Sequence, residues 1–424
     1  MPPDPLASLV SPYVGVVRGV QEVLAGPQDV RLVTMWCESA HAATLVGSPV
    51  AHSGGGSGTS PANARAAAIG EAVERYSASF ADPGGLVVAT ARELGPAAVD
   101  PARFALFTEA QYSSPGFRYV PFDRDTRLGW IEGRALPGGE PAWLPAQVVH
   151  LVTARDEPAI CRATSSGLAC HADPEEATLR ALLEVIERDA FMITWNARLT
   201  WPRLGWKGND ALEAFMRERV APTGLHVRAI DLSAFWDVPC VLGVARSDAP
   251  GAAPLGVGAA AAATVERAVE KAVDEAVRVR TWAQAMHLHG VPPPDEIRDF
   301  DDHVRFYAEP ANAARASFLD ASPSTRAAAD VQPVPGESAG AQVEAICERL
   351  ARRSASAYAV DVTSPDIREA GLAVVRVVAP ELCALDVEHD ARMLGGRRLY
   401  DEPLRLGWRR LTEGDVNPDP HPFP

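Results

Sequence analysis

The stretch PEEATLRALLEVIERD (174–189) carries the pattern that decides the fold, because two other stretches repeat it. The related stretches read PANARAAAIGEAVERY (61–76) and VERAVEKAVDEAVRVR (265–280). When the first residue of each is counted as zero, alanine stands at +3 and +7 and glutamate at +10 in all three. Residues at such offsets lie on one face of an α-helix. The chain is therefore predicted to contain three related helices, each presenting small residues and then carboxylates.

Acidic and basic side chains continue this face in two of the three helices. The set comprises Glu71, Glu184 and Glu275 at +10, Glu74 and Glu187 at +13, and Arg75 and Arg188 at +14. The third helix carries Arg278 at +13. A Glu-x-x-Glu pair puts two carboxylates one helical turn apart. Salt bridges on an exposed face would explain one such helix, whereas matched offsets in three helices favour a binding role.

Segments that contain glycine lead into all three helices. They are SGGGSGTS (53–60), SSGLACHAD (165–173) and LGVGAAAAAT (255–264). Their backbone amides are expected to approach an anion, because glycine has no side chain to keep it away. Pro61 and Pro174 follow the candidate caps Ser60 and Asp173, so two helices are predicted to begin at these prolines.

Strand-like runs of apolar and β-branched residues interleave with the helices. They are LHVRAIDL (225–232), VPCVLGVARS (238–247), SAYAVDVTS (356–364) and LAVVRVVAP (372–380). This order predicts an α/β or α+β protein, and we take α+β as the expected fold class. A polar stretch at about 317–340 is predicted to be a loop or mobile insertion. The tail NPDPHPFP (417–424) is predicted to be extended, because alternate prolines prevent a helix or a central strand.

Composition narrows the class of protein. The chain has 424 residues, of which 47% are hydrophobic, so it is long enough for a large enzyme core. A net charge of −15 argues against a general nucleic-acid binder. The six cysteines form no CxxC pair, and the N-terminus lacks a secretory signal. With no apolar run long enough to cross a bilayer, we expect a soluble cytoplasmic protein.

Four carboxylates brought together from two helices would repel one another unless cations neutralised them. Mg²⁺ is the natural candidate, because it takes oxygen ligands and is often shared with nucleotide phosphates. Basic side chains that would face the phosphate oxygens are Arg75, Arg188, Arg198 and Arg280. No GxxxxGK[ST] motif occurs in the sequence. The residues thus predict an ATP–Mg²⁺ site built without a P-loop.

These motifs resemble the YcaO family, and more narrowly its azoline-forming cyclodehydratases. The segments that carry the resemblance are GEAVERYSA (70–78), SSGLACHADPEEATLRALLEVIERDAF (165–191), EKAVDEAVRVR (270–280), FDDHVRFYAEP (300–310), VVAPELCALDVEHDARMLGGRRLY (377–400) and PDPHPFP (418–424). The resemblance implies a fold of three related strand–helix units that enclose a nucleotide site. It further implies a catalytic domain at 51–410, after an N-terminal segment at 1–50 and before an extended tail at 411–424.

The implied reaction closes five-membered rings in a ribosomally made peptide. A Cys, Ser or Thr side chain attacks the preceding backbone carbonyl, and ATP phosphorylates the resulting oxyanion. Phosphate then departs, and a thiazoline or (methyl)oxazoline ring remains. By resemblance, Mg²⁺ would be held by Glu71, Glu74, Glu184 and Glu187. The nucleotide would be contacted by Arg75, Glu184, Arg188, Arg198, Lys271, Glu275 and Arg280. The terminal carboxylate of Pro424 would act as the general base.

Three positions depart from the family pattern. Ser57 stands where many members carry lysine, Ser166 where asparagine is common, and Lys271 where arginine is common. The two serines put contacts to the nucleotide in doubt, whereas Lys271 keeps its charge but loses the bidentate fork of arginine.

The resemblance also implies partners. Only about 50 residues precede the family region, so a leader-peptide-binding protein of the E1-like type is expected to be separate, and a flavin dehydrogenase would complete the pathway. A homodimer is expected by analogy. Two alternatives stay open: a thioamide- or amidine-forming member of the family, and a non-catalytic scaffold subunit of a peptide-modifying complex.

Overall fold

The computed structural model describes residues 5–40, 53–79, 81, 83–152, 156–249 and 253–423. By its internal contacts the chain divides into two compact units. Unit 1 comprises residues 1–24, 32–185 and 336–381, and unit 2 comprises residues 25–31, 186–335 and 382–424. Both units combine helices with mainly antiparallel sheets, so the α+β prediction is confirmed. No helix in these described ranges has the length and apolar character needed to span a bilayer.

The three predicted helices form where the sequence pattern placed them. They are α3 (Pro61–Ser79), α7 (Pro174–Asn196) and α9 (Val265–Leu288). Side-chain caps stabilise their first turns by accepting hydrogen bonds from backbone amides that would otherwise lack a partner. Ser60 accepts from the amide of Asn63 at 3.2 Å, and Asp173 accepts from that of Glu175 at 2.9 Å. Both predicted caps are therefore confirmed.

Unit 1 holds two sheets. One has the order β1-β2-β3, with β1 (Val17–Val23), β2 (Val33–Ser39) and β3 (Ser53–Gly58). The other follows the order β4-β5-β13-β14-β7, with β6 paired to β5. Its strands are β4 (Leu86–Ala89), β5 (Leu128–Leu136), β6 (Pro141–Pro145), β7 (Leu168–His171), β13 (Ala357–Asp361) and β14 (Ala373–Val378). This unit also holds α3 and the first part of α7, up to Val185, whose remainder belongs to unit 2. The other α-helices among its described residues are α1 (Pro5–Ser8), α4 (Ala91–Leu94), α5 (Glu109–Tyr112), α6 (Ala146–Val149), α12 (Ala339–Ala351) and α13 (Pro365–Glu369).

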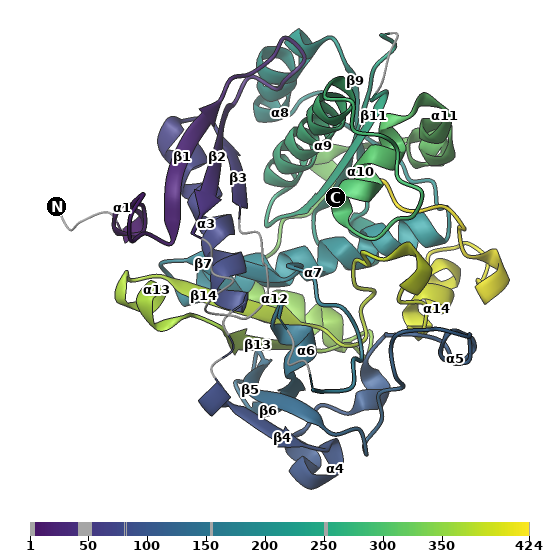
Figure 1. Ribbon diagram of the computed structural model, residues 1–424. Helices are drawn as coiled ribbons and strands as arrows, with labels where there is room; N and C mark the ends of the chain where they lie inside the picture. The colour runs from purple at the N-terminus through teal and green to yellow at the C-terminus, as the bar shows by residue number, and fades with distance from the viewer. Residues whose placement is uncertain are drawn as a thin grey trace. The chain divides into compact units, whose positions relative to one another are not determined.

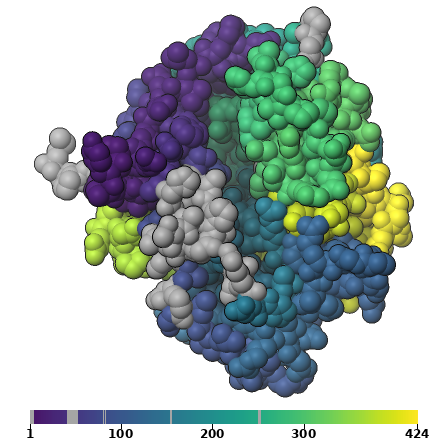
Figure 2. Space-filling view, in the orientation of Figure 1, coloured from purple at the N-terminus to yellow at the C-terminus, as the bar shows by residue number. Residues whose placement is uncertain are grey.

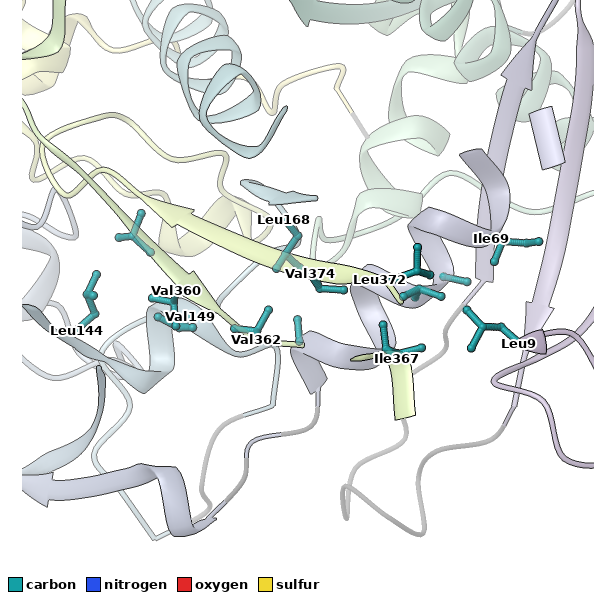
Figure 3. Packing of buried hydrophobic residues seen from close by; sticks show 14 of the residues in the cluster. Leu9, Ile69, Leu144, Val149, Leu168, Val360, Val362, Ile367, Leu372 and Val374 are labelled. Carbon is teal, nitrogen blue, oxygen red and sulfur yellow. The ribbon is translucent and has the colours of Figure 1, made fainter. Parts of the chain in front are cut away.

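The core of unit 1 joins these sheets to α3. Ile69 from α3 and Val360 and Val374 from the second sheet belong to one buried cluster, together with Leu144 and Leu168 (Figure 3). Burying an aliphatic side chain of this size contributes about 1.5–3 kcal/mol. The core therefore fixes the helix that carries the first pair of glutamates.

Unit 2 is built on one sheet with the order β11-β10-β9-β8-β12. Its strands are β8 (Arg203–Gly205), β9 (His226–Asp231), β10 (Cys240–Arg246), β11 (Leu255–Ala261) and β12 (Thr325–Ala327). Besides α9, its helices are α8 (Asp210–Phe215), α10 (Phe300–Ala308), α11 (Pro310–Ala313) and α14 (Arg397–Arg405). All four predicted strand runs are confirmed, as β9, β10, β13 and β14. The stretch at about 317–340, which was predicted to be a loop or mobile insertion, contains a short strand, β12, that pairs in parallel with β8.

Glycines in β3 and β11 let α3 and α9 pack directly on these strands (Figure 1). A Cβ atom built on Gly56 would lie 2.3 Å from the backbone nitrogen of Ala68, and one on Gly256 would lie 2.1 Å from the carbonyl oxygen of Ala276. Real Cβ atoms do not approach backbone so closely. The glycines that precede these helices thus have a packing role that the sequence interpretation did not include.

Gly56→Ala is expected to destabilise unit 1 by about 1–3 kcal/mol, because the added methyl group would force α3 away from β3. Gly70→Ala is the matched control, since a Cβ there meets nothing within 4 Å and the change favours the helix by about 0.5–1 kcal/mol. Thermal unfolding followed by circular dichroism measures both changes. Equal midpoints for the two variants would contradict this account of the glycines.

Candidate functional site

Two of the acidic side chains are held by amides of the strand that precedes their own helix. The Gly55 amide in β3 donates to Oε2 of Glu71 in α3 at 2.6 Å. In the same way, the Ala259 amide in β11 donates to Oε2 of Glu275 in α9 at 2.9 Å. Both amides lie six residues before the start of the helix and sixteen before the glutamate. The glycine-containing segments were predicted to bring their amides close to an anion. In the structure, the anion that these two amides contact is a glutamate carboxylate of the helix that follows.

The glutamates at +13 are held by the strand of the following repeat. Cys170 in β7 donates its amide to Oε1 of Glu74 at 2.8 Å. Ala261 in β11 donates its amide to Oε2 of Glu187 at 3.2 Å. Each of these amides lies four residues before the start of its own helix. The repeat seen in the sequence is thus also a repeat of amide–carboxylate contacts.

Unit 1 gathers Glu71, Glu74 and Glu184 in one electrostatic environment. Burial first, and then the charges of Glu184 and Glu71, raise the pKa of Glu74 to about 8, although the hydrogen bond from the Cys170 amide acts to lower it. Arg75 donates to Oε1 of Glu71 at 2.5 Å and to the carbonyl oxygen of Ser53 at 2.8 Å. In this structure Arg75 therefore pairs with a predicted metal ligand.

Arg376 in β14 is a charged residue of this environment that the sequence interpretation missed. It is buried, donates to the carbonyl oxygens of Thr164 at 2.7 Å and Val148 at 3.1 Å, and interacts electrostatically with Glu184. Burial lowers the pKa of Arg376 to about 10. The signal that points to it is a single charge inside the apolar run LAVVRVVAP (372–380).

Unit 2 gathers Glu187, Arg188, Lys271 and Glu275. Burial raises the pKa of Glu275, whereas the charges of Arg188 and Arg278, and to a lesser extent Lys271, lower it. Nε of Arg188 lies 3.3 Å from Oε1 of Glu187. These acidic and basic groups thus neutralise one another in part.

Arg188 also meets the C-terminal tail. Its guanidinium carbon lies 4.3 Å from the ring centroid of Phe423. This distance is within the range of a cation–π interaction. Arg188, predicted to contact phosphate, is therefore placed between an acidic side chain and the end of the chain.

Arg280 in α9 is buried, with 2% of its surface exposed. Its Nε and Nη1 atoms have no hydrogen-bond partner among the described residues. Burial lowers the pKa of Arg280, and the charge of Asp29 offsets part of this effect. A buried guanidinium with unsatisfied donors fits a phosphate oxygen, and the predicted contact of Arg280 to phosphate stays a prediction.

Arg198 lies at the tail in this structure. Its Nη1 donates to Oδ1 of Asn417 at 3.3 Å and lies 3.8 Å from Oδ2 of Asp419. Its backbone adopts a left-handed conformation with φ of 51°. The contacts of Arg198 that the structure describes thus hold the tail, whereas the resemblance implied a contact to phosphate.

The predicted general base, the terminal carboxylate of Pro424, lies outside the described residues. Residues 417–423 form neither helix nor strand, as predicted, whereas a short 3-10 helix at Glu413–Asp415 lies within the tail that was expected to be extended; Phe423 is fully buried. Among the three departures from the family pattern, Ser57 pairs with Thr34 of β2, and the Ser166 amide donates to Oγ1 of Thr164 at 3.2 Å.

Comparison with known families identifies this architecture. A family model described as YcaO cyclodehydratase, ATP- and Mg²⁺-binding, matches residues 55–383. This match covers more than half of the chain, so the chain belongs to the YcaO family, and the predicted resemblance is confirmed. The family binds ATP and Mg²⁺.

Solved structures share the fold. A heterocyclase described in complex with substrate and cofactor has a TM-score of 0.80 and 25% identity, over 99% of this chain and 57% of that chain. YcaO from Methanopyrus kandleri, bound with AMPPCP and Mg²⁺, has a TM-score of 0.59 and 20% identity, over 89% of this chain and 88% of that chain. The YcaO-like fold is therefore confirmed.

Two curated relatives also match. An uncharacterized protein of Methanothermobacter thermautotrophicus is 30% identical over 194 residues, which are 45% of this chain and 47% of the relative. An uncharacterized protein in the tfuA 3′ region of Rhizobium leguminosarum bv. trifolii is 28% identical over 121 residues, 28% of this chain and 29% of the relative. The chain thus spans less than half of these relatives.

The donor set fits Mg²⁺ together with a phosphate-bearing ligand. Within the described part of the chain, no three His, Cys, Asp or Glu side chains are arranged to hold a metal ion by themselves. Mg²⁺ usually takes one or two carboxylates and completes its shell with water and phosphate oxygens. Mutual repulsion among Glu71, Glu74 and Glu184 is relieved by a bound cation. Unit 1 therefore holds carboxylates that a cation would neutralise, and unit 2 holds the guanidinium of Arg280, which an anion would satisfy.

Glu74→Gln is expected to remove the stabilisation of the protein by ATP and Mg²⁺, because one carboxylate of the cation-binding set is lost. The ligand-free variant is expected to unfold at a higher temperature than the wild type above pH 8. The reason is that the raised pKa of Glu74 gives stability at low pH that is lost as the pH rises from 4.5 through about 8. Glutamine cannot ionise and keeps that stability.

Thermal unfolding with and without ATP–Mg²⁺, at pH 6 and pH 9, measures both effects. Glu176→Gln is the control, since this partly exposed carboxylate of α7 lies 3.8 Å from Arg180 and belongs to no predicted ligand set. A ligand-induced rise for Glu74→Gln as large as that of the wild type would contradict the assignment.

Proposed function

We propose that this protein is an ATP-dependent cyclodehydratase that converts Cys, Ser or Thr residues of a ribosomal precursor peptide to thiazoline or (methyl)oxazoline. The observation that carries the proposal is a repeated hydrogen bond, in which a backbone amide of a strand donates to a glutamate carboxylate. The glutamates are Glu71, Glu74, Glu187 and Glu275. Such contacts fix carboxylates in place before a ligand arrives. Family membership and the similarity to a heterocyclase support the same reading.

The chemistry assigns distinct tasks to these side chains. ATP supplies the phosphoryl group that turns a peptide oxygen into a leaving group. Glu71, Glu74, Glu184 and Glu187 would hold Mg²⁺, and their charges would be neutralised by it. Catalysis would then rest on positioning and on charge stabilisation rather than on a protein nucleophile.

Basic side chains would take the phosphate oxygens. Arg280 offers unsatisfied guanidinium donors in a buried setting, and Lys271 adds a positive charge near Glu275. Arg188 would complete the set from α7. Burial raises the pKa of the thiols of Cys37 to about 11 and of Cys170 to about 12, which argues against a cysteine nucleophile at neutral pH.

A second candidate is a thioamide- or amidine-forming activity of the same family. The observation that favours it is the similarity to the protein of the tfuA 3′ region. Both reactions would use the same ATP–Mg²⁺ chemistry on a peptide backbone, but the attacking group differs. It is a side chain of the peptide itself in the first and an external sulfide or amine in the second.

Partners follow from the proposed substrate. A solved complex, the Escherichia coli microcin synthetase McbBCD with pro-MccB17 bound, has the same fold in one chain, with a TM-score of 0.61 and 15% identity. We propose that this protein also works in a complex, and that a separate leader-peptide-binding protein assists it in acting on its peptide. A flavin dehydrogenase would oxidise azolines to azoles, and a homodimer is the proposed assembly.

Incubation of the full chain with ATP, Mg²⁺, a cognate precursor peptide and its leader-binding partner is expected to remove one water per ring and release phosphate. Mass spectrometry of the peptide measures the change. Exchange of oxygen for sulfur after addition of sulfide would instead establish the thioamide activity. An unchanged peptide mass with a confirmed cognate precursor would sink both activities and favour the scaffold alternative.

Deletion of Pro424 is expected to abolish ring formation while leaving ATP binding intact, because the terminal carboxylate would be moved back by one residue. Peptide mass and the ATP dissociation constant measure the two properties separately. An extra C-terminal residue is the complementary variant, since it moves the carboxylate in the opposite direction. Full ring formation by either variant would remove the terminus from the mechanism.

A further inference from the structure

The tail of unit 2 presents an unusual hydrogen-bonding problem. From residue 417 onward every second residue is proline, so half of the backbone nitrogens carry no hydrogen. Residues 420–423 are nevertheless buried. Buried carbonyl oxygens need donors, and a strand partner cannot be used by a segment that lacks alternate amides.

Side chains of unit 2 supply these donors one after another. Arg392 donates to the carbonyl oxygen of Asn417 at 2.5 Å, and Nε1 of Trp195 donates to that of Asp419 at 3.1 Å. The Tyr307 hydroxyl donates to the carbonyl oxygen of Pro420 at 2.6 Å. Nδ1 of His303 lies 2.7 Å from the carbonyl oxygen of His421 and Nε2 lies 3.0 Å from that of Val387, so the neutral ring donates to His421 in its Nδ1-protonated tautomer.

These donors come from separate elements of the unit. Trp195 lies at the end of α7, whereas His303 and Tyr307 lie one turn apart on α10. The rings of His303 and His421 stack with centroids 3.9 Å apart. The C-terminal region (yellow) lies against the green region that contains α10 (Figure 2).

The last described residue connects this tail to the acidic helix. Phe423 is fully buried, with its ring centroid 4.8 Å from that of Phe191 and 4.3 Å from the guanidinium carbon of Arg188. Because proline alternates with other residues, a slip by one position would put a proline where Phe423 lies. It would also move the end of the chain by about 3 Å.

We propose that Tyr307, His303 and Trp195 are positioning residues that fix the register of the tail, and that Phe423 in turn positions Arg188. The inference rests on the proposed function for its consequence, the placement of Arg188 for the phosphates of ATP. The register itself is a property of unit 2 and is measured without any turnover. A shift of a catalytic group by 1 Å is enough to reduce a rate about a hundredfold, so the register has chemical weight.

Tyr307→Phe in the full chain removes one hydroxyl and leaves the ring. The tail amides of Asp419, His421 and Phe423 are expected to exchange hydrogen about tenfold faster than in the wild type, because the Pro420 carbonyl loses its donor. Tyr400→Phe is the control, since it also removes a hydroxyl that donates to a carbonyl oxygen, but to that of Leu394 at 2.8 Å, outside residues 417–423. Hydrogen exchange read by mass spectrometry compares the peptides that end the chain.

Phe423→Leu keeps an apolar side chain but removes the aromatic face beneath Arg188. It is expected to weaken ATP–Mg²⁺ binding several-fold, whereas Tyr400→Phe leaves the dissociation constant unchanged. Equal tail exchange in Tyr307→Phe and Tyr400→Phe would overturn the register, and unchanged ATP binding in Phe423→Leu would overturn the link to Arg188. Absence of ring formation by the wild type would count against the proposed function alone, because neither measurement depends on it.

Discussion

The contact on which the rest of the structure depends is the hydrogen bond from a strand amide to a glutamate of a following helix. It requires the helix to lie directly on the strand, and only glycine at Gly56 and Gly256 permits that approach. It also requires alanine on the facing side of the helix, which the sequence supplies at +3 and +7. The alanines and glycines therefore allow the close packing of helix on strand that brings the carboxylate within hydrogen-bonding distance of the strand amide.

The hydrogen bonds from strand amides stabilise the ionised form of buried glutamates, whereas burial alone would favour their protonated form. An amide that donates to a carboxylate favours its ionised form, and burial opposes it. For Glu74 burial and two neighbouring carboxylates prevail, so its pKa is raised to about 8 despite the Cys170 amide. A protein that keeps such a group sacrifices stability in the ligand-free state. That loss of stability is consistent with a site organised to bind a cation.

Much of the fold could be predicted from local sequence because its signals are local. Helix periodicity, caps such as Ser60 and the alternation of the strand runs all act within about twenty residues. The contacts of Arg198 with the tail could not be predicted, because Asn417 and Asp419 lie more than two hundred residues away in the sequence. The same holds for Cys170, whose contribution is a backbone amide and leaves no trace in the identity of the side chain.

The third helix shows why three similar stretches do not carry three equal sites. A glutamate at +13 is held in the first two repeats by the strand that leads into the next helix. The third repeat has Arg278 at this position, and its Nε donates to Oδ2 of Asp274 at 3.0 Å within the same helix. A second buried carboxylate there would need a donor from elsewhere in the chain. Arg278 needs no such donor. Its positive charge acts to lower the pKa of Glu275, so the third helix keeps the glutamate at +10 without a second glutamate at +13.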